Sequence, residues 1–390
     1  MDLRKLIIIP VLLFWSLIIL AQNNTDYIKA DSLSWKLYET GEWKELLIEG
    51  NKLIKQQSDF PNLRLRMAYA AFILSDFGEA KKHYTQVLKE DSYNQFARYY
   101  LQLCETYLNH PLAANYHQSY LQANDDTTSK LAIRSLTLES GIKSPATVLR
   151  KNGYYNRISL GTQLGWKIFF DQSLSFFGQQ LAVINAPGNG TVDYSASKQF
   201  EYYGKLSYAL SARWSAWAGY HYLNTNFLAQ RYHSNIGLGG LKISGNYLDV
   251  QADASIGNLT GLITHQYNAM LTYFPLGNLN LYGITRISLH SDSVATETII
   301  SQVAGFKLSK KIWFEASGSF GRLNNFLEVD GLYVYNSIDP STSKLGTSLL
   351  YQLGRRSLLQ LNYTQEKKQN ITQNTNFNQH SLTTSISWKF

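Results

Sequence analysis

Residues 248–256 read LDVQADASI, and this stretch decides the fold because its side chains alternate strictly. One face carries Leu, Val, Ala, Ala and Ile, and the other carries Asp, Gln, Asp and Ser. Successive side chains of a β-strand point to opposite faces, so the pattern predicts a strand with one apolar and one polar face. Residues 311–322, KIWFEASGSFGR, have the same alternation.

The same period of two continues to the C-terminus and predicts an antiparallel barrel over residues 154–390. Alternating segments of about ten residues, separated by turns, are typical of transmembrane β-barrels of the bacterial outer membrane. A soluble β-sandwich would instead need a polar outer face. The twelve expected strands are 155–170, 198–210, 213–224, 230–243, 246–256, 261–275, 278–290, 297–308, 311–322, 341–353, 356–368 and 379–390.

The connections between these strands alternate in length. Short turns such as 211–212 and 309–310 alternate with longer loops such as 323–340. Outer-membrane barrels have short periplasmic turns and longer outer loops, so the C-terminus is expected on the periplasmic side. Residues 171–197 are expected as an outer loop, but SLSFFGQQLAVI at 173–184 could form an extra strand or a helix.

The composition agrees with a protein that meets a membrane interface. Of the 390 residues 16% are charged and 14% are aromatic, including 27 Tyr, with a formal net charge of +8. Amphipathic rings such as Tyr are enriched at headgroup level. The single cysteine, Cys104, excludes an intrachain disulfide, and no basic-aromatic motif indicates a nucleic-acid partner.

Residues 1–21 have the features of a secretory signal peptide. Arg4 and Lys5 give a positive start, and an apolar run over residues 6–20 follows. A membrane anchor is the alternative, but the run of about 15 residues is short of the roughly 20 that a helical span needs. We expect cleavage after Ala21 and export of the chain.

Residues 22–122 have a helical period and resemble the tetratricopeptide repeat family. The stretch FGEAKKHYTQVLKEDSYNQFARYYLQLCETYL at 77–108 carries the resemblance, and weaker copies lie at 40–55 and 109–121. The resemblance implies stacked helix pairs in the periplasm, with a concave groove that binds a partner protein. A connector with a helix near residues 129–140 is expected at 123–153. The matching positions are Gly78, Ala80, Tyr84, Leu88, Asp91, Asn94, Ala97, Leu101 and Tyr107.

Charged residues on the polar faces of the expected strands are candidates for lining the lumen. They either form a path for a charged solute or pair with one another to fill the interior, and pairing is the favoured interpretation. The candidates are Arg157, Lys167, Glu201, Lys205, Arg213, Asp249, Asp253, Arg286 and Glu315.

No catalytic, metal or cofactor site is expected. The pairs His233-Ser234 and His290-Ser291 attract notice, because some outer-membrane barrels cleave lipids with His and Ser. Neighbouring strand residues point to opposite faces, however, so neither pair can form a dyad directly. The eight histidines have no metal-binding spacing such as HxH or HExxH. A lipid hydrolase is therefore the less favoured alternative.

The last eleven residues, HSLTTSISWKF, have apolar or Thr side chains at every second place and end on an aromatic. This resembles the terminal signal by which the barrel assembly machinery recognises its substrates, and Trp388 and Phe390 carry the resemblance. We expect this closing strand to pair with the first strand near residues 158–166.

The order of domains resembles exopolysaccharide exporters such as the poly-N-acetylglucosamine outer-membrane porin, and also the shorter YaiO-type proteins. The resemblance implies export or transport of a polysaccharide or small solute, with residues 22–122 docking a periplasmic protein. The alternative is a non-conducting barrel that anchors a scaffold for an envelope assembly complex. The expected partners are outer-membrane lipids, the assembly machinery and that periplasmic protein.

Overall fold

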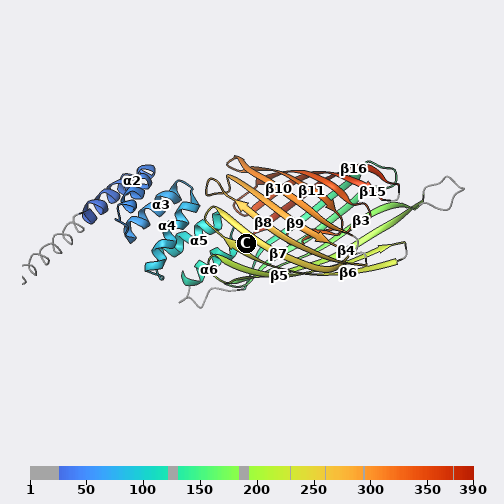
Figure 1. Ribbon diagram of the computed structural model, residues 1–390, viewed down its shortest axis with the longest axis horizontal. Coiled ribbons are helices and arrows are strands. Elements are labelled where there is room, and N and C mark those ends of the chain that lie inside the picture. Colours follow the sequence, from blue (N-terminus) through green and yellow to red (C-terminus); the bar gives the residue numbers. More distant parts are fainter. Residues whose placement is uncertain are drawn as a thin grey trace, which may run out of the picture. The chain divides into compact units, whose positions relative to one another are not determined.

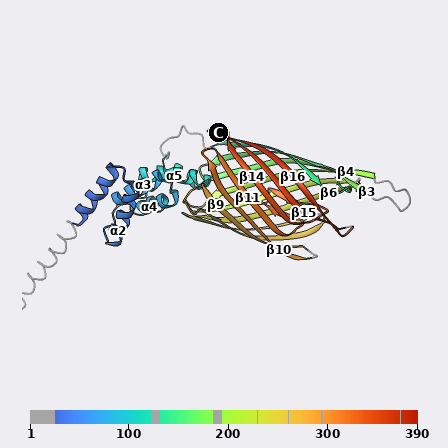
Figure 2. The same cartoon turned by 90° about the horizontal axis from the view of Figure 1, so that it is seen from above.

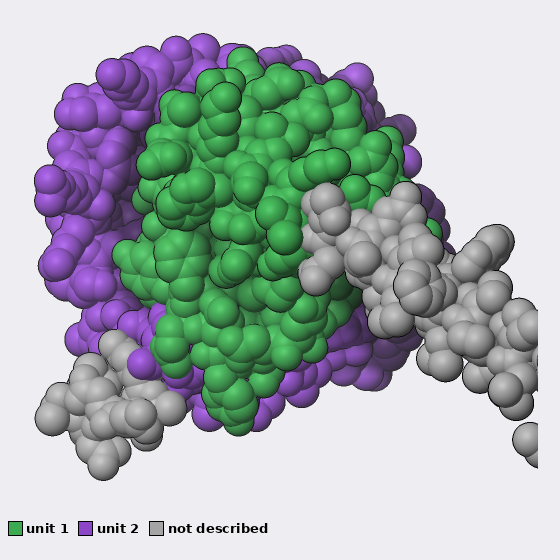
Figure 3. Space-filling view, turned by 90° about the vertical axis from the view of Figure 1, so that its left-hand side faces the viewer, with its two compact units in different colours: residues 1–107 green, residues 108–390 purple. Residues whose placement is uncertain are grey.

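The computed structural model describes residues 26–121, 131–183, 193–228, 230–259, 261–292, 295–371 and 373–390. The predicted signal peptide lies outside these residues. The chain forms two compact units, residues 1–107 and 108–390 (Figure 3). Among the described residues, none of the helices combines the length and the apolar character that crossing a membrane requires.

Six helices lie within the described residues, five of them in the first unit. Local signals explain where they begin: Pro61 occupies the first turn of α3, and the Asp76 side chain accepts a hydrogen bond from the Glu79 amide at the start of α4. No family model supports the tetratricopeptide assignment, which stays a prediction. The five helices are 26–39, α2 (Trp43–Lys55), α3 (Pro61–Ile73), α4 (Phe77–Glu90) and α5 (Gln95–Tyr107).

Alanines and one aromatic form the main core of the first unit. Ala68, Ala71, Ala80 and Ala97 are fully buried around Tyr84, so α3, α4 and α5 approach closely. A buried ion pair also joins two of these helices: Lys81 Nζ lies 2.9 Å from Glu105 Oε1, and the side chains are 5% and 3% exposed.

The second unit contains α6 (Pro111–Leu121) and a closed barrel of fourteen antiparallel strands (Figures 1 and 2). Each strand pairs with its neighbours in the chain, except that β11 pairs with β14 and that β16 closes the barrel on β1. The strands are β1 (Ala132–Pro145), β2 (Gly153–Gly165), β3 (Ile168–Val183), β4 (Asp193–Ala209), β5 (Trp214–Phe227), β6 (Gln230–Ser244), β7 (Leu248–Leu259), β8 (Leu262–Tyr273), β9 (Leu281–Ser291), β10 (Thr296–Ser309), β11 (Ile312–Leu323), β14 (Ser341–Gln352), β15 (Ser357–Asn370) and β16 (Thr375–Lys389).

The prediction of about twelve strands is wrong by two. β1 occupies part of the expected connector, where a helix was expected near residues 129–140. Its outward row of Leu136, Leu138 and Ile142 is interrupted by Ser140, which weakens the apolar pattern. The second additional strand is β3, which covers residues 173–183 of the stretch for which a strand and a helix were both open, and the structure shows the strand. Its first residues lie within the expected strand 155–170, because only residues 166–167 separate β3 from β2.

The predicted closure of the barrel is also wrong in its partner. β16 pairs with β1, with Leu136 opposite Trp388, and not with residues 158–166. The expected partner, near residues 158–166, belongs to β2, because the sequence pattern did not reveal β1 as the first strand. The terminal Phe390 extends this closure, since its amide donates a hydrogen bond to the carbonyl oxygen of Arg134 at 3.0 Å.

The outer face of the barrel carries exposed apolar side chains on strands all around the wall. This surface and the absence of a free sheet edge give the unit the architecture of transmembrane barrels. Examples are Ile158, Leu174, Leu206, Leu241, Ile256, Leu271, Leu289, Ile300, Leu349, Leu361 and Leu382.

Candidate functional site in the barrel lumen

Residues 324–340, between β11 and β14, fold into the lumen, and we call them the lumen hairpin. Within it, β12 (Phe326–Glu328) and β13 (Tyr333–Tyr335) pair as a two-stranded sheet. The sequence indicated a longer outer loop here. Instead, the hairpin contacts inward-facing side chains from opposite parts of the wall, as the following contacts show.

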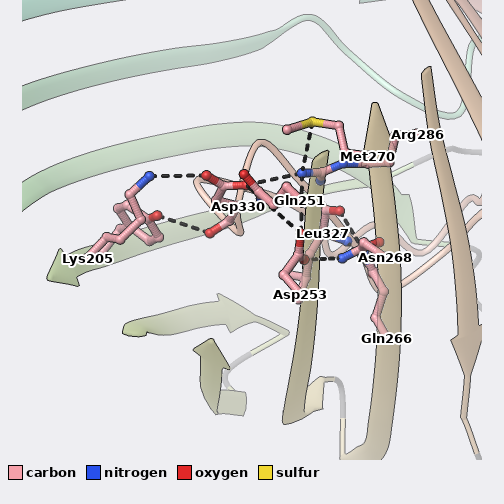
Figure 4. Close-up of polar contacts among 10 residues, drawn as sticks. Lys205, Gln251, Asp253, Gln266, Asn268, Met270, Arg286, Leu327 and Asp330 are labelled. Atoms are coloured by element: carbon pink, nitrogen blue, oxygen red, sulfur yellow. Dashed lines mark hydrogen bonds and ion pairs between the residues drawn. The ribbon is translucent and has the colours of Figure 1, made fainter. Parts of the chain in front are cut away.

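The tip of the hairpin is held by its Asp330 carboxylate (Figure 4). Lys205 Nζ lies 3.1 Å from Oδ2, and Arg286 Nη2 lies 3.1 Å from Oδ1. The Gln251 side-chain amide donates a further hydrogen bond to Oδ1 at 2.8 Å. The three donors come from β4, β9 and β7, so one carboxylate bridges distant strands across the lumen. Charge-assisted hydrogen bonds of this kind are among the stronger polar contacts in proteins.

The backbone at the tip is also fixed and is strained. The Tyr203 hydroxyl donates to the Asp330 carbonyl oxygen at 3.0 Å, and His221 Nδ1 lies 2.6 Å from the Gly331 carbonyl oxygen. Val329 and Asp330 have φ values of 51° and 54°, and Gly331 has φ 82°. A β-branched residue at positive φ is a conformational outlier, so the wall contacts must offset the strain of this turn.

The N-terminal arm of the hairpin combines backbone recognition with apolar packing. The Gln266 side-chain amide donates to the Leu327 carbonyl oxygen at 2.9 Å, and its oxygen accepts from the Leu327 amide at 3.0 Å. The Leu327 side chain is buried against Leu223, Ile236 and Leu259. This part of the lumen is therefore apolar and closely packed.

The C-terminal arm binds near the seam where the barrel closes. The Tyr333 hydroxyl donates to Glu139 Oε2 at 3.0 Å, and the Arg157 guanidinium lies over the Tyr333 ring at 3.9 Å. Near the end of the arm, Arg150 and Asp339 form a bidentate pair with distances of 2.9 and 3.2 Å. The hairpin is thus held at its tip and along both arms.

The structure places the nine predicted lumen residues in several groups. Four of them, Arg157, Lys205, Asp253 and Arg286, belong to the surroundings of the hairpin. Of the others, Glu201 lies 3.2 Å from His221, Asp249 pairs with His110 and Lys242, and Glu315 accepts a hydrogen bond from Tyr282. Lys167 and Arg213 lie in turns rather than in strands.

Sequence reasoning missed Glu139 and Asp330. Glu139 belongs to β1, the strand hidden in the expected connector. Asp330 lies in a loop, where no alternation indicates which way a side chain points. Its partners Arg286, Gln251 and Lys205 are 44, 79 and 125 residues away in the chain, so no local signal could have found them.

The helix α6 contacts inward-facing side chains of the same unit. At its start, His110 Nε2 lies 2.7 Å from Asp249 Oδ2, which also pairs with Lys242 Nζ at 3.0 Å. From within the helix, the Asn115 amide donates to Gln163 Oε1 at 2.7 Å. Asp249 and Gln163 lie near the ends of β7 and β2 that adjoin the short turns. His110 and α6 are thus tied to that end of the barrel.

The two His-Ser pairs do not assemble a dyad. His233 is exposed and contacts the Tyr222 hydroxyl, whereas Ser234 is buried on the opposite face. His290 is 3% exposed and packs against the Phe326 ring of the hairpin. Within the described ranges, no group of three or more His, Cys, Asp and Glu side chains is arranged to hold a metal ion.

Comparison with known proteins gives matches among solved structures only. No family model and no curated protein matches the chain. The chain is similar to the TodX deltaS2S3 mutant monoaromatic hydrocarbon channel, at 10% identity and a TM-score of 0.46 over 72% of this chain and 94% of that chain. It is also similar to Omp33 of Acinetobacter baumannii (8%, TM-score 0.38, 66% and 99%) and to the NanC porin (10%, TM-score 0.38, 65% and 100%). Such identities and TM-scores say nothing about a substrate.

Proposed function

We propose that the protein is an outer-membrane channel in which the lumen hairpin is a gate. A closed barrel with an apolar exterior satisfies the requirements of a lipid environment. The observation that carries the proposal is the bridge from Asp330 to Lys205 and Arg286, because it fixes a loop across the path that a solute would take.

The polar contacts of Asp330 favour a hairpin that can move over one that fills the lumen permanently. Hydrogen bonds to charged groups contribute about 1.5–3 kcal/mol each, and water can replace them when a loop moves. The left-handed backbone of Val329 and Asp330 opposes the closed arrangement. A closed state favoured by a few kcal/mol leaves an open state in the range of about 0.1–10% of molecules, which a ligand or a voltage can enrich.

Single-channel recording in planar bilayers tests the gate. The test variant replaces residues 326–335 with a short Gly-Ser linker, and Asp330→Asn is a milder second variant. We expect brief, rare openings of the wild type, longer openings of Asp330→Asn and a steady current through the shortened protein. Asp292→Asn, a carboxylate outside the hairpin, should behave like the wild type.

Two results would contradict this function. If neither the wild type nor the shortened protein conducts, the barrel is an anchor. If both conduct equally, the hairpin does not control passage. Heat-modified mobility on gels, measured alongside, establishes that each variant has formed a barrel.

The scaffold alternative has its own supporting observation, on the helical unit. Ring contacts connect Trp35, Tyr38, Tyr69, Tyr100 and Tyr99 across three helices, and the first and last of these are about half exposed. Exposed aromatic side chains are enriched in protein interfaces. We propose that this face, in the periplasm, docks a partner protein.

Cross-linking in cell envelopes tests the docking proposal, with a photoreactive residue at position 99 and a control at Lys89 on α4. A defined adduct at position 99 alone supports docking. Equal labelling at both positions, or labelling at neither, argues against it.

A further inference from the structure

We propose that Lys205, Arg286 and Gln251 form a binding site for a solute that carries a carboxylate, and that Asp330 occupies this site as an internal mimic. The inference deepens the proposed gate and rests on it, since a solute reaches the site only when the hairpin moves. It assigns a substrate class to the channel and a role to the residue at the hairpin tip.

The three donors are arranged around one carboxylate. Arg286 Nη2 and Gln251 Nε2 donate hydrogen bonds to Asp330 Oδ1 at 3.1 and 2.8 Å (Figure 4). Lys205 Nζ donates to Asp330 Oδ2 at 3.1 Å. All three belong to strands of the wall and none to the hairpin. When the hairpin leaves, the donors therefore remain on the same rigid sheet, at the spacing that a carboxylate fits.

The two cations have no second carboxylate at hydrogen-bond distance within the described residues. The nearest approach to another acid is from Arg286 Nη2 to Asp253 Oδ2, at 3.8 Å. The Asp253 oxygens already accept hydrogen bonds from Asn268 and Gln251. The Lys205 and Arg286 side chains are 21% and 9% exposed with the hairpin in place. Withdrawing Asp330 takes from each cation its closest carboxylate, and a new anion would restore those charge-assisted hydrogen bonds.

The charges around the site favour weak binding rather than tight capture. Asp253 lies 3.8 Å from Arg286, and Asp171 is the cross-strand partner of Lys205, so two carboxylates balance the two cations in number when Asp330 is absent. Attraction of a solute then comes from hydrogen bonds to the three donors and not from a strong positive field. A transport site needs binding that is favourable enough for entry and weak enough for release.

The strain of the tip gives a free carboxylate an advantage over the internal one. Asp330 reaches the donors only with its own backbone and that of Val329 in the left-handed region. Such conformations are unfavourable for residues that carry a Cβ, and a soluble carboxylate does not bear that cost. Competition for the same three donors therefore couples arrival of the solute to release of the hairpin.

The test uses succinate as the probe and glycerol as the neutral control. Titration calorimetry in detergent measures binding to the wild type, to Asp330→Ala and to the protein with residues 326–335 replaced. We expect succinate to bind both altered proteins more tightly than the wild type, and glycerol to bind none. Adding Lys205→Gln and Arg286→Gln to the altered proteins should weaken succinate binding by about tenfold or more. Lys198→Gln, an exposed lysine on the same strand, should leave it unchanged.

The outcomes separate this inference from the gate. Failure of succinate to bind the altered proteins, or binding that survives Lys205→Gln with Arg286→Gln, overturns the site whether or not the channel conducts. In bilayers, millimolar succinate should lengthen wild-type openings and partially block the shortened protein. If the shortened protein conducts but succinate has no effect on its current, the result supports the gate and contradicts the carboxylate site.

Discussion

Glu139 on β1 and Arg157 on β2 are direct cross-strand partners, and their side chains meet at 3.2 Å beneath the Tyr333 ring of the lumen hairpin. One ion pair therefore joins the strand that closes the barrel, its neighbour and the hairpin. Because β1 also pairs with β16, the hairpin binds next to the seam between the first and last strands.

Arg157→Gln should loosen both the hairpin and the wall. Arg157 is 2% exposed in its side chain, and its loss leaves Glu139 without its cation and Tyr333 without its stacking partner. Breaking one side of a buried pair costs about 3–5 kcal/mol. The expected result is a lower temperature for the heat-induced shift on gels and longer channel openings. If Arg157→Gln has the gel-shift temperature and the channel openings of the wild type, the Glu139–Arg157 pair is dispensable.

Gly331→Ala should open the hairpin tip more than a glycine substitution elsewhere in the barrel. Gly331 has φ 82°, and a Cβ there would collide with the Leu238 side chain. Gly261 is a matched control, because it has φ 81° but no atom within 4 Å of the position of a Cβ. The left-handed conformation costs about 1–2 kcal/mol at both sites, and the collision adds to it only at Gly331. Equal channel openings in the two variants would contradict the close fit of the tip.

Glu105→Gln should destabilise the helical unit without affecting the barrel. The substitution leaves the Lys81 ammonium buried between α4 and α5 with no carboxylate at its ion-pair position. The expected loss is about 3–5 kcal/mol, whereas Lys81→Met combined with Glu105→Leu should be nearly neutral. Helical circular dichroism of the full chain in detergent, followed with temperature, measures both. A double variant as unstable as the single one would point to a role beyond charge pairing.

Acid should weaken the helical unit through Glu79. A hydrogen bond to His83 is the largest cause that lowers the pKa of Glu79 to about 2. Lys82 lowers the pKa of Glu79 further, whereas burial raises it. Because the folded-state pKa is below the reference value of 4.5, the stabilisation is complete above that value and is lost as the pH falls toward 2. Thermal unfolding of the wild type should shift more between pH 6 and pH 3 than that of Glu79→Gln. Parallel shifts would exclude Glu79 as a source of the acid sensitivity.

Removal of Phe390 should reduce insertion of the barrel and leave the helical unit folded. The residue directly follows the closing strand β16 and is 58% exposed, so it can contact another protein or lipid. Fractionation of outer membranes measures the inserted fraction, and protease resistance of the helices measures their folding. Normal insertion would remove the assembly role of this residue but not the barrel.

Sequence alone predicted the strands whose two faces differ in chemistry. Residues 248–256 are such a case, and β7 spans them. β1 was not predicted, because Ser140 interrupts its apolar face. β3 was one of two alternatives for residues 173–184, and its start was merged with β2 because the turn between them is short. Alternation could also place Lys205 and Arg286 on polar faces. It could not reveal Asp330, because the backbone of an irregular loop is set by contacts with residues remote in the chain.

All three side-chain partners of the Asp330 carboxylate precede it in the chain, on β4, β7 and β9. These strands stand apart in the wall, so the three donors converge on one carboxylate only when β4, β7 and β9 belong to one closed barrel. Loop closure over 44–125 residues is entropically costly, so docking of the tip belongs to the late steps of folding. The tip therefore gains its contacts only in a wall that is already paired, and a barrel that lacks one of these strands has no complete site for it.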